Sequence, residues 1–170
     1  IKSRSVAKMT VSFNGEFIDD FDGTVYLDPS NGEWIADLNR LQVDLSQQLL
    51  AALPSSVTSI LPVSNIDGQI SLAGRVYGEA DILGQMPKFD LQGTVRDLNI
   101  NSDQLPVGIQ SVNASFAINQ DGFSVTQAMG NLDQGKFELS YRQTGLLERS
   151  DWSLAGQCQH VNFRPQMLSV

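Results

Sequence analysis

The sequence predicts a mainly β protein: an antiparallel meander folded into an open trough or open sandwich, with one short helix near residues 45–53. Three observations predict this fold. Apolar and polar residues alternate with a period of two along most of the chain, which is typical of strands with one buried face. Turn-forming residues such as Asn14-Gly15 separate the alternating segments at short intervals. One strand pattern also occurs three times, each time with the same break in its alternation.

The repeated pattern is a run of apolar residues at every second position, followed by a slip of one residue. The inward positions of its three copies are Trp34, Ala36, Leu38, Leu41 and Val43; Phe89, Leu91, Gly93, Val95, Leu98 and Ile100; and Trp152, Leu154, Gly156, Cys158, Val161 and Phe163. Such a slip indicates a β-bulge, because one extra residue returns the apolar set to the same face. The repetition predicts a repeating β unit whose surface, rather than a catalytic centre, carries the function.

The remaining strands follow from the same alternation and from the turns between them. We expect strands around residues 9–13, 21–27, 34–43, 66–72, 89–100, 112–118, 123–125, 137–141 and 152–163. Turns are expected at residues 14–15, 30–32, 120–122 and 134–135. The glycines on the inward phase (Gly68, Gly93 and Gly156) could relieve crowding where the sheet bends.

One helix is expected directly after the first copy of the pattern. Asp44 can cap its N-terminus, and Gln47 three residues later completes a capping-box pattern. Pro54 would end it. Its apolar stripe consists of Leu45, Leu49 and Leu53, spaced as one face of a helix requires.

Composition restricts the function classes. The 170 residues fit a single β-rich domain spanning 1–170, with 41% hydrophobic and 18% charged residues. A net charge of −8 argues against nucleic acid and against electrostatic docking on an anionic membrane face. No run approaches the roughly 18 apolar residues of a membrane span. Because the chain begins at Ile1, we expect a fragment of a longer repetitive protein, with any membrane contact made by regions outside it.

Catalytic and metal-binding patterns are weak. The single Cys158 excludes an internal disulfide, and its inward phase predicts a small buried side chain. The only histidine, His160, has no second histidine to complete a metal site or a catalytic triad. The carboxylates preceding Gly23 (Asp19, Asp20 and Asp22) indicate a solvated acidic turn rather than a calcium loop, because the later ligands are missing. We predict no enzyme activity, no metal and no cofactor.

Several phrases resemble the AsmA-like and TamB-like proteins of Gram-negative envelopes, which are long repetitive β proteins. The matching segments are VDLS at 43–46 running into LLAALP at 49–54, NIDGQISLAG at 65–74, FDLQGTV at 89–95 and VNFRP at 161–165. The resemblance touches most of the chain from Val43 onward.

This resemblance implies a trough with an apolar inner surface, located in the periplasm and anchored to the inner membrane by a segment absent here. It implies that the groove holds or conducts phospholipid acyl chains between the two membranes and supports outer-membrane assembly. The expected lipid-contacting residues are Leu38, Ile70, Leu72, Phe89, Leu91, Val95, Phe116, Ile118, Leu139 and Trp152.

Other interpretations stay open at this point. The inward faces could close on each other as a sandwich core, and the aromatic residues Trp34, Phe89 and Trp152 would then be core residues. The chain is also similar in style to protein N of type II secretion systems, which implies a module that binds an envelope or outer-membrane assembly protein, for instance by strand addition. A carbohydrate-binding or adhesion-type sandwich would expose aromatics on its polar face, where only Tyr26 is expected.

Overall fold

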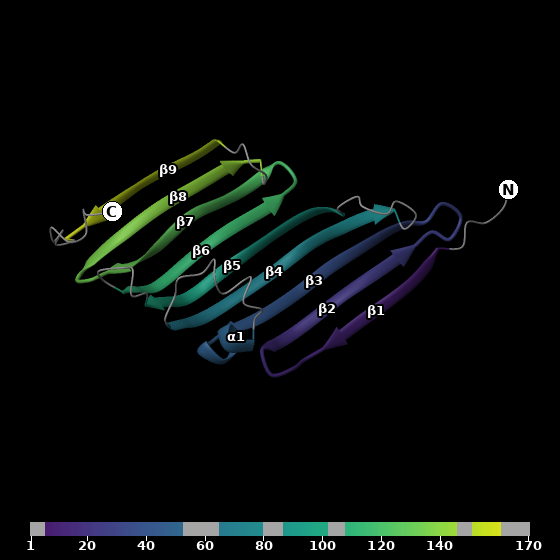
Figure 1. Cartoon of the computed structure of the whole chain (residues 1–170), viewed down its shortest axis with the longest axis horizontal. Coiled ribbons are helices and arrows are strands. Elements are labelled where there is room, and N and C mark those ends of the chain that lie inside the picture. Colours follow the sequence, from purple (N-terminus) through teal and green to yellow (C-terminus); the bar gives the residue numbers. More distant parts are fainter. Residues whose placement is uncertain (1–5, 53–64, 80–86, 102–107, 146–150, 161–170) are drawn as a thin grey trace.

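The computed structural model of the protein describes residues 6–52, 65–79, 87–101, 108–145 and 151–160. These residues form one open sheet of nine antiparallel strands, ordered in space as they are in the sequence (Figure 1). The strands are β1 (Ala7–Phe13), β2 (Ile18–Leu27), β3 (Glu33–Leu45), β4 (Asn65–Glu79), β5 (Lys88–Asn101), β6 (Ile109–Asn119), β7 (Gly122–Leu132), β8 (Gly135–Thr144) and β9 (Asp151–Gln159). The predicted mainly β meander is confirmed, and β1 and β9 form the two edges of the described sheet.

Tight turns explain why each strand pairs with the next one. After β2, the side chain of Asp28 accepts a hydrogen bond from the backbone amide of Ser30, and Gly32 has a φ of 72°. After β6, the Asn119 side chain accepts hydrogen bonds from the amides of Asp121 and Gly122. Short polar side chains and glycine favour such reversals, so consecutive strands lie side by side.

Bulges occur at the predicted slips in alternation. The ladders shift register between Leu38 and Leu41 and again between Val95 and Leu98. Two of the three predicted slips are therefore bulges. For the third copy, His160 directly follows β9 with a left-handed φ of 58°, while Val161 and Phe163 lie outside the described residues.

Two asparagine side chains bridge the bulges of β5 and β6. The Asn113 amide accepts a hydrogen bond from the backbone N–H of Asp97 and donates one to the carbonyl of Ser111. The Asn99 amide does the reverse, accepting from the N–H of Ser111 and donating to the carbonyl of Asp97. Asp97 and Ser111 have φ values of 48° and 52°, in the region that non-glycine residues seldom occupy. Each asparagine thus satisfies backbone groups that a bulge removes from the ladder.

The helix is shorter than expected and has a different cap. It spans Gln47–Ala52 (α1), and the Ser46 hydroxyl accepts a hydrogen bond from the N–H of Leu49. Asp44 and Leu45 instead belong to β3, so the prediction that Asp44 caps the helix is wrong. The ladder with β4 extends β3 as far as the pairing of Leu45 with Gly68 and leaves Ser46 as the first residue free to cap. Leu53 and Pro54 lie outside the described residues.

The acidic residues near the N-terminus are not in a turn. Asp19, Asp20 and Asp22 all lie within β2, where polar side chains of β3 and β4 bind them. The expected acidic turn is therefore wrong, because the pairing of β2 with β3 continues as far as Ile18.

Few of the described hydrophobic side chains are fully buried. Among the described hydrophobic residues, Val112 (8% exposed) and Ala128 (4%) are the buried ones. Cys158 is exposed, so its predicted burial is wrong. The reason is its place on β9, an edge strand that pairs only with β8. Most apolar side chains between the two edges are half-buried by their lateral neighbours.

Candidate functional site

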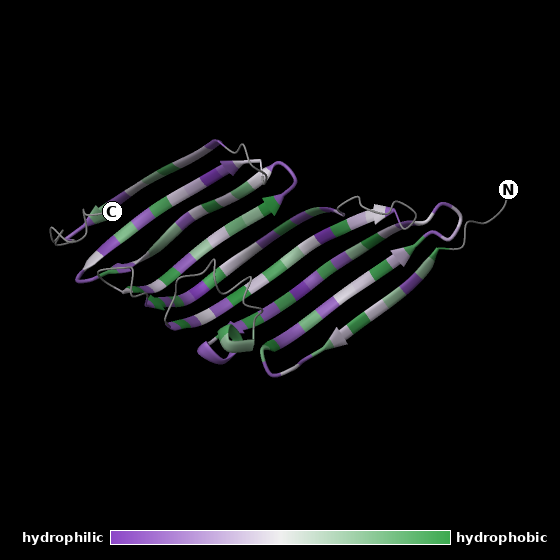
Figure 2. Cartoon of the chain, in the orientation of Figure 1, coloured by the Kyte–Doolittle hydropathy of each residue, from purple (hydrophilic) through white to green (hydrophobic). Residues whose placement is uncertain are grey.

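One face of the sheet is apolar across all nine strands. Residues opposite each other in an antiparallel ladder point to the same face. The ladders connect one such row from edge to edge: Phe13, Phe21, Leu41, Leu72, Gly93, Phe116, Val125, Tyr141 and Leu154. We call the surface formed by this row and the parallel rows beside it the apolar face. In Figure 2, bands of apolar and polar residues alternate along the strands, as such a two-faced sheet requires.

The ten predicted lipid-contacting residues all lie on the apolar face. The ladders place them there, in rows with one another: Leu38, Ile70, Leu72, Phe89, Leu91, Val95, Phe116, Ile118, Leu139 and Trp152. Nine of them are half-buried, and Trp152 on the edge strand is 68% exposed. The predicted list of lipid-contacting residues omitted six further side chains of the first row: Phe13, Phe21, Leu41, Val125, Tyr141 and Leu154. Their inward phase was the signal that could have added them.

Aromatic rings on the apolar face occupy the space above glycines of the neighbouring strand. A Cβ added to Gly93 would meet the Phe116 ring at 2.5 Å, and one added to Gly130 would meet the Phe137 ring at 2.9 Å. Trp34 fills the same space above Gly78, at 3.2 Å. The missing side chains therefore let these rings lie against the backbone, as in the aromatic rescue of glycines in other sheets.

Aromatic contacts also join neighbouring strands on this face. The rings of Phe13 and Phe21 stack with centroids 4.6 Å apart. Phe123 contacts Phe116 at 6.2 Å and Tyr141 at 6.1 Å between centroids. Such pairs add about 0.5–1.5 kcal/mol each beyond the burial of their area. They tie β1 to β2 and β6 to β8 without requiring a covering layer.

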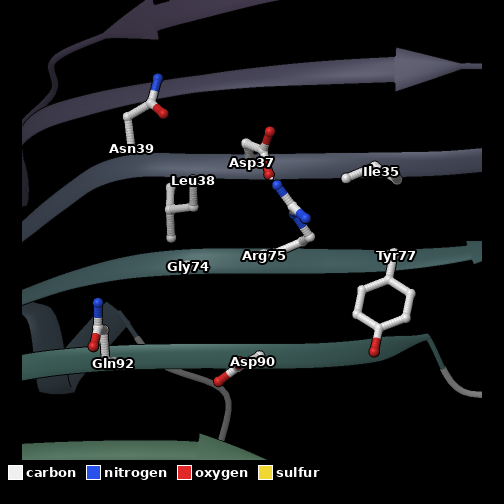
Figure 3. A pocket seen from close by; sticks show the side chains of 9 residues that line it. All are labelled: Ile35, Asp37, Leu38, Asn39, Gly74, Arg75, Tyr77, Asp90 and Gln92. Atoms are coloured by element: carbon white, nitrogen blue, oxygen red, sulfur yellow. Dashed lines mark hydrogen bonds and ion pairs between the residues drawn. The ribbon is translucent and has the colours of Figure 1, made fainter.

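The opposite face is polar, and two of its arginines form ion pairs with aspartates of neighbouring strands. Arg75 of β4 donates a 2.6 Å hydrogen bond to Asp37 of β3 (Figure 3). This hydrogen bond, and then the attraction of the Asp37 charge, raise the pKa of Arg75 above its ordinary value. Arg40 pairs with Asp20 at 3.1 Å. Tyr26 lies on this face as expected, with the Lys8 ammonium 5.8 Å from its ring centroid.

An open hollow of about 890 Å³ lies on the polar face over β3, β4 and β5. Its side chains include Asp37, Asn39, Arg75, Asp90 and Gln92 (Figure 3). These side chains offer hydrogen bonds and charges of both signs to a molecule in the hollow. Within the described ranges, no group of three or more His, Cys, Asp or Glu residues could hold a metal ion.

No protein-family model, curated protein or solved structure matches this chain. In the part of the chain that the structure describes, no helix is long and apolar enough to cross a membrane.

Proposed function

We propose that this chain is a periplasmic β unit of an AsmA-like or TamB-like protein, whose apolar face holds or conducts phospholipid acyl chains between the inner and outer membranes. The observation that carries the proposal is the apolar face itself, which continues over nine strands while the described residues provide no second sheet to cover it. Its role would be to support outer-membrane assembly. A segment outside this chain would anchor the protein to the inner membrane.

The dimensions of the apolar face suit an acyl chain. With strands about 4.8 Å apart, the eight spacings between β1 and β9 make a row about 38 Å long. One leaflet of the bilayer's hydrocarbon core is about 15 Å thick, so a lipid tail lying across the strands is shorter than the row. The tail would touch several strands at once and could shift along the row without leaving apolar surface.

The half-buried state of the apolar face supports a ligand of this kind. Side chains such as Leu91 and Ile118 still meet solvent although both neighbouring strands are present. Covering such surface gains about 25 cal/mol per Å², which favours any apolar molecule that can spread over it. Contiguous apolar surface of this extent is unusual for a protein that has no partner for it. Holding a lipid tail requires no catalytic group, metal or cofactor.

Photocrosslinking tests the proposal with matched positions. A photoreactive residue is placed at Val95 or Leu154 on the apolar face and, as controls, at the adjacent Thr94 or Ser153 on the polar face. After irradiation in cells, adducts are identified by mass spectrometry. We expect phospholipid adducts at Val95 and Leu154 and none at the controls. Equal lipid labelling of both faces, or labelling of neither, would contradict the proposal.

The second candidate is a module of the kind found in type II secretion, which would bind an envelope or outer-membrane assembly protein. The observation that favours it is the outer edge of β9, which has no partner strand among the described residues, since exposed edges accept an added strand. In the same experiment this function predicts adducts to one protein at Ser153 and no lipid at Val95.

A further inference from the structure

The outer edge of β9 lacks the features that normally protect an edge strand. Such strands are usually interrupted by proline, bulges or charged side chains, lysine above all. β9 has one charged residue, Asp151 at its start, and no lysine, arginine or proline. Its ladder with β8 runs from Asp151 to Gln159 without a register shift. Trp152 and Leu154 are 68% and 60% exposed on its apolar side. The other edge strand, β1, carries Lys8.

Two glycines on the apolar face, Gly74 and Gly93, have an apolar residue opposite them on both neighbouring strands. Gly93 lies between Leu72 and Phe116, and Gly74 lies between Leu38 and Leu91. At both positions the missing side chain is matched by large apolar residues on the two neighbouring strands. Gly156 has Leu139 on the β8 side and nothing on the other side within the described sheet. A strand that completes this pattern must place a large apolar residue opposite Gly156.

We propose that a second copy of this chain supplies that strand, with the two β9 strands paired antiparallel and the two Ala155 residues opposite each other. In this register Leu154 of each copy faces Gly156 of the other. Trp152 likewise faces Cys158, so each large apolar residue meets a small one. One register therefore completes the pattern at Gly156 in both copies at once, as a two-fold interface requires.

The charges near the edge complement each other in the same register. Asp151 of one copy would face Gln159 of the other, which is paired with Lys136 in its own ladder. Ser153 would face Gln157, whose side chain donates a 2.9 Å hydrogen bond to Glu138. Ser153 pairs with Arg142 in its own ladder. Along the rows of residues that cross the interface, Asp151 therefore shares a row with Lys136 of the other copy, and Arg142 shares a row with Glu138 of the other copy. No like charges lie opposite each other.

The symmetry of this pairing has a consequence for the two apolar faces. Antiparallel strands of one sheet are related by a two-fold axis perpendicular to the sheet, so paired residues point to the same side. The apolar faces of the two copies would join into one continuous surface. The proposed self-association is independent of what that surface holds, and it applies where no further strand of a longer chain pairs with the outer edge of β9.

Disulfide formation tests the register in the full chain. Trp152→Cys places a new thiol opposite the native Cys158 of the second copy, and we expect a covalent dimer under mild oxidation. The unaltered chain is the control, because its two Cys158 residues would lie six positions (158 − 152), or about 20 Å, apart along the strands. Opposite residues in an antiparallel ladder alternate between hydrogen-bonded and non-hydrogen-bonded pairs, and the two kinds of pair hold their side chains at different distances. A second position, Ala155→Cys in a Cys158→Ser background, is therefore tested as well. Its control is Ser153→Cys in the same background, four positions (157 − 153) out of register.

The expected results distinguish the proposed register from other pairings and from a monomer. A dimer in solution by light scattering, with crosslinks for Trp152→Cys and Ala155→Cys but not for the two controls, supports the proposed register. Ala155→Lys, which sets two like charges opposite each other at the axis, should weaken the dimer by about fivefold. A chain that stays monomeric at high concentration overturns the proposal, as do crosslinks at Ser153 that equal those at Ala155. Normal far-ultraviolet circular dichroism of each variant shows that a missing crosslink does not come from unfolding.

Discussion

Strands β5 and β9 carry nearly the same sequence pattern but occupy different environments. Phe89, Leu91, Gly93 and Val95 of β5 correspond to Trp152, Leu154, Gly156 and Cys158 of β9. The β5 residues are half-buried, whereas all of β9 is exposed. Within the described sheet, β5 is hydrogen-bonded to β4 and β6, and β9 to β8 alone. In a single-layer sheet the burial of a side chain therefore depends on how many strands flank it, and not on its own pattern.

The two matching glycines show the same difference. A Cβ on Gly93 would clash with the backbone of Ser71 on one side and with the Phe116 ring on the other. A Cβ on Gly156 would meet Glu138 and Leu139, both on β8. An edge strand can move away from one neighbour, but a central strand cannot move away from two.

The largest expected effect is therefore that of Gly93→Ala compared with Gly156→Ala. We expect Gly93→Ala to lower the free energy of unfolding by about 3 kcal/mol, because overpacking between two fixed neighbours strains both. Gly156→Ala should lower it by about 1 kcal/mol or less. Urea denaturation measures both, with Gly15→Ala as the control because nothing lies within 4 Å of its Cβ position. Equal effects at the two glycines would contradict the comparison.

The next effect concerns the matching leucines. Leu91→Ala should cost about 2 kcal/mol in the free energy of unfolding, since it removes a partly buried side chain flanked on both sides. Leu154→Ala should cost about 0.5 kcal/mol, since 60% of that side chain is already exposed. Thermal unfolding measures both losses, at protein concentrations low enough to prevent any self-association. A loss at Leu154 as large as that at Leu91 would show that something covers β9.

A smaller effect is expected at the bulges, which β5 and β6 have and the β8–β9 ladder lacks. Asn113→Ala removes the hydrogen bonds to Asp97 and Ser111, and we expect a loss of about 1–2 kcal/mol. Ser115→Ala, two residues further along the same strand, is the control. Hydrogen exchange should show faster exchange of the Asp97 amide in Asn113→Ala alone. Unchanged exchange there would mean that the side chain does not hold the bulge.

The smallest effect is expected for Arg75→Gln on the polar face. The ion pair with Asp37 is solvent-accessible, with the Arg75 side chain 57% exposed, and such pairs contribute little to stability. Because the pKa of Arg75 is raised above its already high ordinary value, the stabilisation from its charge is fully present at neutral pH and is lost only as the pH rises through that raised pKa. Arg75→Gln should therefore leave the pH dependence of the melting temperature near neutral pH unchanged. A new pH dependence in that range would show that Arg75 controls the titration of a neighbour.

Much of this architecture follows from local sequence. Alternation, turn residues and the two slips at Leu38 and Val95 were enough to predict the strands, their order and the bulges of β3 and β5, but not the register shifts that involve β6 and β7. The ten residues expected on one face lie there because a period of two, corrected at each bulge, determines the side on which a residue points. The helix cap was misplaced because the extent of β3 depends on its pairing with β4, a contact distant in sequence.

What the sequence determined by itself was the two-faced character of each strand, since that depends on the residue pattern and on backbone geometry alone. What only the tertiary structure decided was the environment of each face. The exposure of Cys158, the position of the Phe116 ring above Gly93 and the reciprocal hydrogen bonds of Asn99 and Asn113 all depend on which strands lie side by side. The physical reason is that burial and cross-strand hydrogen bonds are properties of pairs of strands, and a single strand's sequence does not contain its partner.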